Sequence, residues 1–247
     1  REIEKLTTQY ATDATVQATA GAWLMTNGDA TGARPLLERA IALDPQYAEA
    51  MGWLSDAYRL MGTFGHYPPA EVMPKAKAMA ERALTIDPNL PEALSCLAAV
   101  EEIYERNFAR SDVLYSRALE LDPRHSRSRA QRALWRIVRG AMAPEVALSE
   151  GERSVKDDPL NAWVGAMYSF ILGIAGKHKD SMAEAERSLA LDPDSFFAHW
   201  NVMRAHAWSG QYERAVQEAP ALFNASGRQQ WALGLLAWTY GQLGRLE

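Results

Sequence analysis

The sequence predicts an all-α fold, a right-handed superhelical solenoid of antiparallel helix pairs. The first observation is a motif ending in Asp-Pro that recurs along the chain, with its prolines at Pro45, Pro88, Pro123, Pro159 and Pro193. The second is the segment before each proline, where apolar residues recur three and four apart, as on one face of a helix. The third is the interval between these prolines, 34 to 43 residues, which suits one helix pair per repeat.

Each Asp-Pro motif is expected to close the second helix of a repeat. Proline lacks an amide hydrogen and disfavours a helical residue before it, and Asp suits the turn. Five residues before each proline stands a small residue, which would let the two helices of a pair approach closely. These residues are Ala40, Ala83, Ala118, Ser154 and Ser188.

The register predicts six repeats followed by the first helix of a seventh, an array that spans 14–247. The repeats are expected at about 14–47, 48–90, 91–125, 126–161, 162–195 and 196–229, with the last helix at about 230–243. Residues 1–13 have apolar residues at helical spacing and are expected to form a flanking helix. The second repeat is about nine residues too long, and Pro68 and Pro69 place a turn or lid near 63–71. A tolerated surface insertion is the simpler interpretation of this segment.

Composition places the chain among globular proteins. It has 247 residues, of which 48% are hydrophobic and 23% charged, and it has no apolar run of the roughly 18 residues that span a membrane. The single cysteine, Cys96, excludes an internal disulfide and fits a reducing compartment. We therefore expect a cytoplasmic location, with the periplasmic or extracellular part of an anchored protein as the alternative. Because the chain begins at Arg1, we expect it to be a segment of a longer protein.

The sequence carries little that suggests catalysis. It has no glycine-rich phosphate loop and no nucleophile elbow. His199 and His206 share a helix face but lack a third metal ligand. We therefore expect no enzyme activity, no cofactor and no metal, and the net charge of −5 argues against nucleic-acid binding by this region.

The repeats resemble the tetratricopeptide repeat. Glycines fall near the turn between the two helices of a pair, and small residues recur on the packed faces of both helices. The turn glycines are Gly28, Gly62, Gly176 and Gly210, and the small residues on the first helices are Gly21, Ser55, Ala98 and Ser169. This resemblance implies that first helices line the concave side of the solenoid and that a protein or peptide binds there.

Candidate groove residues follow from that resemblance, because all eight tryptophans fall in expected first helices. The alternative is that the tryptophans pack between neighbouring repeats. The residues that we expect to line the groove are Trp53, Arg132, Trp135, Arg139, Trp163, Phe197, Trp200, Asn201, Arg204 and Trp208.

Arginines gather in the middle of the chain. Between Arg106 and Arg139 the sequence has nine arginines against three acidic residues. The spacing of Arg129, Arg132, Arg136 and Arg139 puts them on one helix face, which could bind carboxylates or phosphates. The alternative is a solvated face that pairs with acidic side chains of neighbouring helices.

A more specific resemblance covers residues 68–123. The double proline before a second helix and the Arg106-Asn107-Phe108 turn are similar to C-terminal tetratricopeptide arrays of bacterial multidomain signalling proteins. The Lys and Asn pattern with which chaperone-binding members hold a carboxylate is missing here. The resemblance implies a non-catalytic interaction or sensor module of a larger bacterial regulator, and the alternative is a scaffold in an assembly or cell-envelope complex. The last helix lacks a covering partner, so self-association through that end is also expected.

Overall fold

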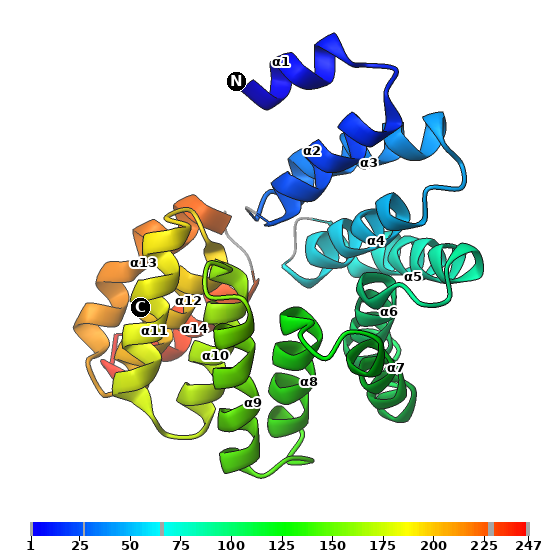
Figure 1. The fold of residues 1–247 in the computed structure, drawn as a ribbon. Helices are drawn as coiled ribbons and strands as arrows, with labels where there is room; N and C mark the ends of the chain where they lie inside the picture. Colours follow the sequence, from blue (N-terminus) through cyan, green and yellow to red (C-terminus); the bar gives the residue numbers. More distant parts are fainter. Residues whose placement is uncertain (1, 27, 65–66, 227–229, 246–247) are drawn as a thin grey trace. The chain divides into compact units, whose positions relative to one another are not determined.

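The structure, a computed structural model, describes residues 2–26, 28–64, 67–226 and 230–245. Over these residues it consists of fourteen α helices joined by short connections, and none of them forms a strand (Figure 1). The prediction of an all-α repeat fold is confirmed.

After α1 (Glu2–Gln9), two kinds of helix alternate along the chain. The first helices of the pairs are α2 (Ala14–Thr26), α4 (Ala48–Thr63), α6 (Pro91–Ile103), α8 (Ser126–Val138), α10 (Ala162–Ile174), α12 (Phe196–Trp208) and α14 (Gln230–Gln242). The second helices are α3 (Ala30–Leu43), α5 (Pro69–Ile86), α7 (Phe108–Leu121), α9 (Pro144–Asp157), α11 (His178–Leu191) and α13 (Tyr212–Ser226).

The chain divides into two compact units, and each is described here by itself. Unit 1 is Arg1–Ser128 and unit 2 is Arg129–Glu247. The division falls inside α8, so the first residues of this helix belong to unit 1 and the remainder to unit 2.

The Asp-Pro motifs end helices in the way that their chemistry predicts. Asp44 takes an extended backbone conformation after α3, and its N–H still donates to the carbonyl of Ala40 at 2.8 Å. Its carboxylate then accepts the N–H of Gln46 at 2.9 Å, which closes an Asx turn. Asp87, after α5, makes the same pair of contacts. The aspartate therefore satisfies an amide that would otherwise lack a partner beyond the helix end.

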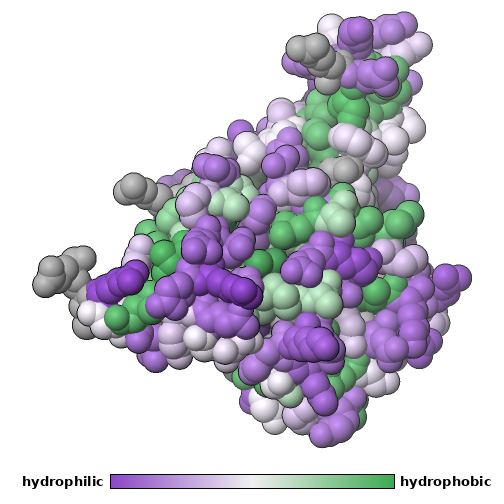
Figure 2. All heavy atoms as spheres, turned by 90° about the vertical axis from the view of Figure 1, so that its left-hand side faces the viewer, coloured by the Kyte–Doolittle hydropathy of each residue, from purple (hydrophilic) through white to green (hydrophobic). Residues whose placement is uncertain are grey.

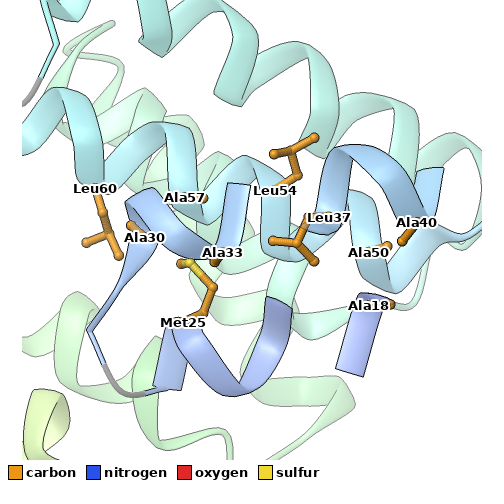
Figure 3. Close-up of a cluster of buried hydrophobic side chains, with 10 residues drawn as sticks. All are labelled: Ala18, Met25, Ala30, Ala33, Leu37, Ala40, Ala50, Leu54, Ala57 and Leu60. Atoms are coloured by element: carbon orange, nitrogen blue, oxygen red, sulfur yellow. The ribbon is translucent and has the colours of Figure 1, made fainter. Parts of the chain in front are cut away.

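Small residues hold the helices of each pair close together. Figure 3 shows this in unit 1, where ten buried side chains, six of them alanines, come from α2, α3 and α4. Ala33, Leu37 and Ala40 of α3 are fully buried there. A Cβ on Gly21 of α2 would lie 2.6 Å from Leu37 Cγ, so this helix crossing depends on the missing side chain.

The long second repeat is accommodated by longer helices. Its α4 has 16 residues and its α5 has 18, whereas α2 and α3 have 13 and 14. Pro68 precedes α5 and Pro69 opens it, a position where a missing N–H costs nothing. Residues 63 and 69–71 of the expected insertion are thus helical, and residues 65–66 lie outside the described residues.

The turns inside the pairs of unit 2 use glycine where the backbone is left-handed. Gly176 follows α10 with a φ of 76°, and Gly210 follows α12 with a φ of 74°. At the matching place in unit 1, after α6, Arg106 takes a φ of 59°, which an L-residue adopts at an energetic cost.

The surface is mixed in character. Figure 2 shows one face of the molecule, on which hydrophobic residues form patches separated by hydrophilic ones. None of the helices in the described ranges has both the length and the hydropathy to cross a membrane.

Candidate functional site

Unit 1 buries a charge cluster that is internally paired. Asp56, on α4, accepts hydrogen bonds from Arg59 Nε at 2.8 Å and from Arg127 Nη2. Burial alone would raise the pKa of Asp56, but Arg127 and Arg59 outweigh it, so the pKa lies below its usual value.

The Arg127 guanidinium also lies 5.6 Å from the ring centroid of Trp53. The half-buried Trp53, a candidate groove residue, is therefore in contact with the chain's own arginine.

Another buried charge of unit 1, Glu101, is also paired within the fold. Buried Glu101 pairs with Lys77 at 3.2 Å and with Arg110 at 3.1 Å. Cys96 is buried, and burial raises the pKa of its thiol well above the usual value. A thiol in that state is a poor nucleophile.

The arginine face of α8 pairs with acidic side chains of α9. Glu150 lies 3.1 Å from Arg129 and 3.4 Å from Arg132. Arg129 also approaches Asp157 at 3.7 Å. Arg139 donates to the carbonyl of Trp135, one helical turn earlier. These contacts match the alternative interpretation of this face, because acidic side chains of a neighbouring helix neutralise two of its arginines.

Arg204, on α12 of unit 2, is the one deeply buried arginine in the described part of the chain that has no acidic partner. Only 1% of it is exposed. Its Nη2 donates to Asn201 Oδ1 at 2.7 Å, to the Ser169 carbonyl at 3.3 Å and to Ser181 Oγ at 3.5 Å. All three acceptors are neutral, so the positive charge is solvated but not neutralised.

Three aromatic rings surround this guanidinium. The Arg204 Cζ atom lies 4.4 Å from the ring centroid of Phe170, 4.4 Å from that of Trp208 and 5.2 Å from that of Trp200. A cation over an aromatic face is attracted by the ring quadrupole. Phe170 comes from α10, so the cage is built from two adjacent first helices. We call Arg204, Phe170, Trp200 and Trp208 the arginine cage.

Two donors of Arg204 have no hydrogen-bond partner in the structure, Nε and Nη1. Nη1 lies against Gly173 of α10, where an added Cβ would be 2.3 Å from it. Burial lowers the pKa of Arg204 to about 9, the direction expected of a desolvated cation without a counterion. Among the described residues, the cation in the cage therefore has no counterion, and two of its nitrogen donors have no acceptor.

The floor of the cage is a pair of buried serines that joins α10 to α11. Ser169 Oγ donates to the Ser181 carbonyl and Ser181 Oγ donates to the Ser169 carbonyl, each at 2.7 Å. Each hydroxyl thus satisfies the backbone of the opposite helix. The same Ser169 carbonyl also accepts from Arg204, so the arginine is fixed to the packing of this helix pair.

Like Arg204, the candidate groove residues Phe197, Trp200 and Asn201 of α12 lie in the interior. Trp200 is 7% exposed and packs on Phe170, Phe197 and Trp231. Asn201 is fully buried, and its Nδ2 donates to the Ala166 carbonyl at 2.8 Å. The expected groove-facing placement of Phe197, Trp200 and Asn201 is therefore not what the structure shows, because these side chains pack α12 against its neighbours.

The other candidates are more accessible. Trp208 is 38% exposed. Trp163, Trp135, Arg132 and Arg139 are half-buried. The structure brings Trp200, Asn201, Arg204 and Trp208 into one cluster within unit 2. Phe170 and Gly173 also belong to this cluster, and the sequence analysis did not single them out.

A hollow lies beside the last turn of α10. Its volume is about 550 Å³, and it is lined by Ile137, Gly140, Ala141, Met142, Ala143, Pro144 and Ile174. Ile174 directly follows Gly173, which touches Arg204. The described residues include no group of three or more His, Cys, Asp or Glu side chains placed to hold a metal ion.

Comparison with known proteins agrees with this architecture. A family model described as a tetratricopeptide repeat matches residues 24–64. No curated protein matches the sequence. A tetratricopeptide repeat protein from Parabacteroides merdae has a similar structure, with a TM-score of 0.60 and 14% identity over 96% of this chain and 89% of that one.

Two further solved structures share the fold. The APC/C hetero-tetramer Cut9-Hcn1 gives a TM-score of 0.64 at 11% identity, and the match covers 96% of this chain and 44% of that chain, so this chain spans less than half of its length. The human IFIT1 dimer with PPP-AAAA gives a TM-score of 0.68 at 12% identity, over 94% of this chain and 69% of that one.

The paired helices and the buried small residues define a helical-repeat protein, a class that generally mediates protein–protein interaction. One repeat of this chain, residues 24–64, matches the tetratricopeptide-repeat model, and the solved structures share the all-α repeat fold.

Proposed function

We propose that this chain is a non-catalytic interaction module of a larger bacterial regulatory protein, and that it binds a segment of a partner protein on the first helices of unit 2. The observation that carries the proposal is the arginine cage. It combines aromatic surface with a cation that no described acidic side chain neutralises. Aromatic side chains and arginine are the residues that most often dominate binding energy at protein interfaces.

The surroundings of the cage support a peptide-like ligand. Trp208 offers a partly exposed ring, and the hollow beside Ile174, whose lining is part apolar and part polar, gives room for a neighbouring side chain. Such a surface, apolar with a few placed polar groups, suits an extended segment that alternates apolar and polar residues. The resemblance of residues 68–123 to arrays of bacterial signalling proteins supports the regulatory context.

Selection from a displayed random-peptide library tests this proposal. The purified chain serves as bait, and selected peptides are cross-linked to variants with a photo-reactive phenylalanine at Trp163 on α10 or at exposed Glu186 on α11, away from the helix end that contacts Trp208. We expect cross-links from position 163 and few from position 186. Failure to enrich any peptide, or cross-links from α11 alone, would contradict the proposed face.

A further inference from the structure

We infer that Arg204 is the receptor for a carboxylate of the bound segment, an Asp or Glu side chain, and that Trp208 is the movable side chain that covers it. This inference rests on the proposed function, since it names the ligand chemistry of the same face. Its first support is the missing counterion. The described residues give Arg204 three neutral acceptors and no carboxylate, and they leave Nε and Nη1 without an acceptor.

Unit 1 shows how this chain treats a buried arginine that serves the fold alone. Arg59 is also almost fully buried, and Asp56, three residues before it on α4, neutralises it at 2.6 Å. In unit 2 the residue three before Arg204 is Asn201, the neutral analogue of aspartate. The buried arginine thus faces a carboxylate in unit 1 and an amide oxygen in unit 2, so only the arginine of unit 1 has a charged partner at this spacing.

Local packing explains why residue 201 is an amide. Asn201 Nδ2 donates to the carbonyls of Ala166 and Phe197, at 2.8 and 2.9 Å. An aspartate here would turn a carboxylate oxygen toward two carbonyl oxygens, which is repulsive. The position that supplies the counterion in unit 1 is therefore used for α10–α12 packing in unit 2, and the described residues supply no other carboxylate to Arg204.

Trp208 controls access to this cation. It is the last residue of α12, it is 38% exposed, and its ring lies 4.4 Å from the Arg204 guanidinium. The Trp208 ring also contacts His178, with the ring centroids 6.1 Å apart. Phe170 and Trp200, by contrast, are held by each other and by Phe197. Rotation of Trp208 is therefore the movement that opens the cage with least loss of packing.

The ligand class follows from the chemistry of the cage. A guanidinium N–H donates a strong, charge-assisted hydrogen bond to a carboxylate, and exclusion of water strengthens that pairing. The aromatic walls of the cage favour an acidic side chain flanked by apolar residues. Inorganic phosphate shares the charge but not the flanking apolar groups, so it serves as a separate arm of the test.

The test follows the Nε–H signal of Arg204 by nitrogen-15 NMR, assigned through its loss in Arg204→Lys. The probes are acetyl-Leu-Glu-Leu-Glu-Leu-amide, the same peptide with glutamine for glutamate, and sodium phosphate. We expect the glutamate peptide to shift this signal and to bind at least tenfold more tightly than the glutamine peptide. Arg204→Met should abolish the difference in affinity between the two peptides. Arg214→Met, a substitution of an exposed residue on α13, should preserve it.

Three outcomes would overturn the inference: equal affinity for both peptides, binding that leaves the Arg204 signal in place, or a shift with phosphate alone. Library peptides that cross-link to position 163 but carry no acidic residue would contradict the carboxylate inference. They would still support the proposed function. Cross-links confined to α11 would instead remove the proposed function. Circular dichroism melts of Arg204→Met, with Arg204→Lys as the conservative variant, separate lost binding from lost fold.

Discussion

Asn201 Oδ1 accepts a hydrogen bond from Arg204 Nη2 at 2.7 Å, across the i, i+3 spacing at which Asp56 pairs with Arg59 in unit 1. The geometry is similar, but one acceptor is neutral and the other is charged. A buried arginine that is paired with a carboxylate has its desolvation cost offset by that partner. The desolvation cost of an arginine without a carboxylate partner is not offset in this way. The same substitution at the two arginines should therefore differ in its cost to stability.

Arg59→Met is expected to destabilise the chain by about 3–5 kcal/mol, because it removes one of the two arginines that compensate the buried Asp56. Arg204→Met is expected to cost less than about 1 kcal/mol, since the lost cation had no counterion. Urea unfolding at pH 7 measures both. A larger loss for the residue-204 variant than for the residue-59 variant would contradict this assignment of the two sites.

Asp56→Asn should be strongly destabilising at neutral pH, by about 3–5 kcal/mol, because two arginines lose their carboxylate. The folded-state pKa of Asp56 lies below its unfolded value, so its contribution is fully present above the unfolded pKa. That contribution is lost as pH falls through the folded pKa. The difference in unfolding free energy between the variant and the original chain should therefore shrink between pH 5 and pH 2, about the range over which such carboxylates titrate. A difference that stays constant over that range would argue against an ionised Asp56.

Trp208→Ala should expose Arg204 without unfolding unit 2. Its Nε–H should then exchange with solvent at least tenfold faster. The matched control is Trp238→Ala on α14, because Trp238 is similarly exposed, at 42%, and its ring packs on Tyr212. Equal exchange rates in the two variants would show that Trp208 does not cover the arginine.

Binding of an acidic peptide should weaken at alkaline pH. The pKa of Arg204 is lowered to about 9 by burial, so the free site is cationic below that pH and loses its charge above it. Affinity for the glutamate peptide should stay level from pH 7 to about 8.5 and fall by up to about tenfold per unit above 9. The glutamine peptide should show no such fall. Unchanged affinity of the glutamate peptide at pH 10 would mean that the guanidinium stays charged in the free site.

The repeat architecture was predictable because it rests on local chemistry. The Asp-Pro motifs at Pro45 and Pro88 and the small residues at Ala40 and Ala83 act within one helix pair, and their spacing repeats. Such signals are visible along the sequence without knowledge of tertiary contacts. The length of α4 and α5 was less predictable, because the insertion could have formed a loop.

The site was only partly predictable. The sequence placed Arg204 and Trp208 together on α12, four residues apart, but it could not show that Phe170 of α10 closes the cage. It also suggested Trp200 as an exposed contact. The structure buries Trp200 against Phe197 and Trp231, and whether a tryptophan packs inward depends on neighbouring helices. Trp200→Ala is now expected to destabilise unit 2 by about 3–5 kcal/mol.

The most direct test of the central claim is calorimetric titration of the tightest library-selected peptide into the original chain, Arg204→Met and Arg214→Met. We predict that Arg204→Met binds the peptide at least tenfold more weakly than the original chain, a loss of about 1.4 kcal/mol. Arg214→Met should bind like the original chain. Replacing the peptide's acidic residue by its amide should cause the same loss, with no further loss when the two changes are combined. Equal affinity of all three proteins for the peptide would contradict the claim that Arg204 anchors the partner.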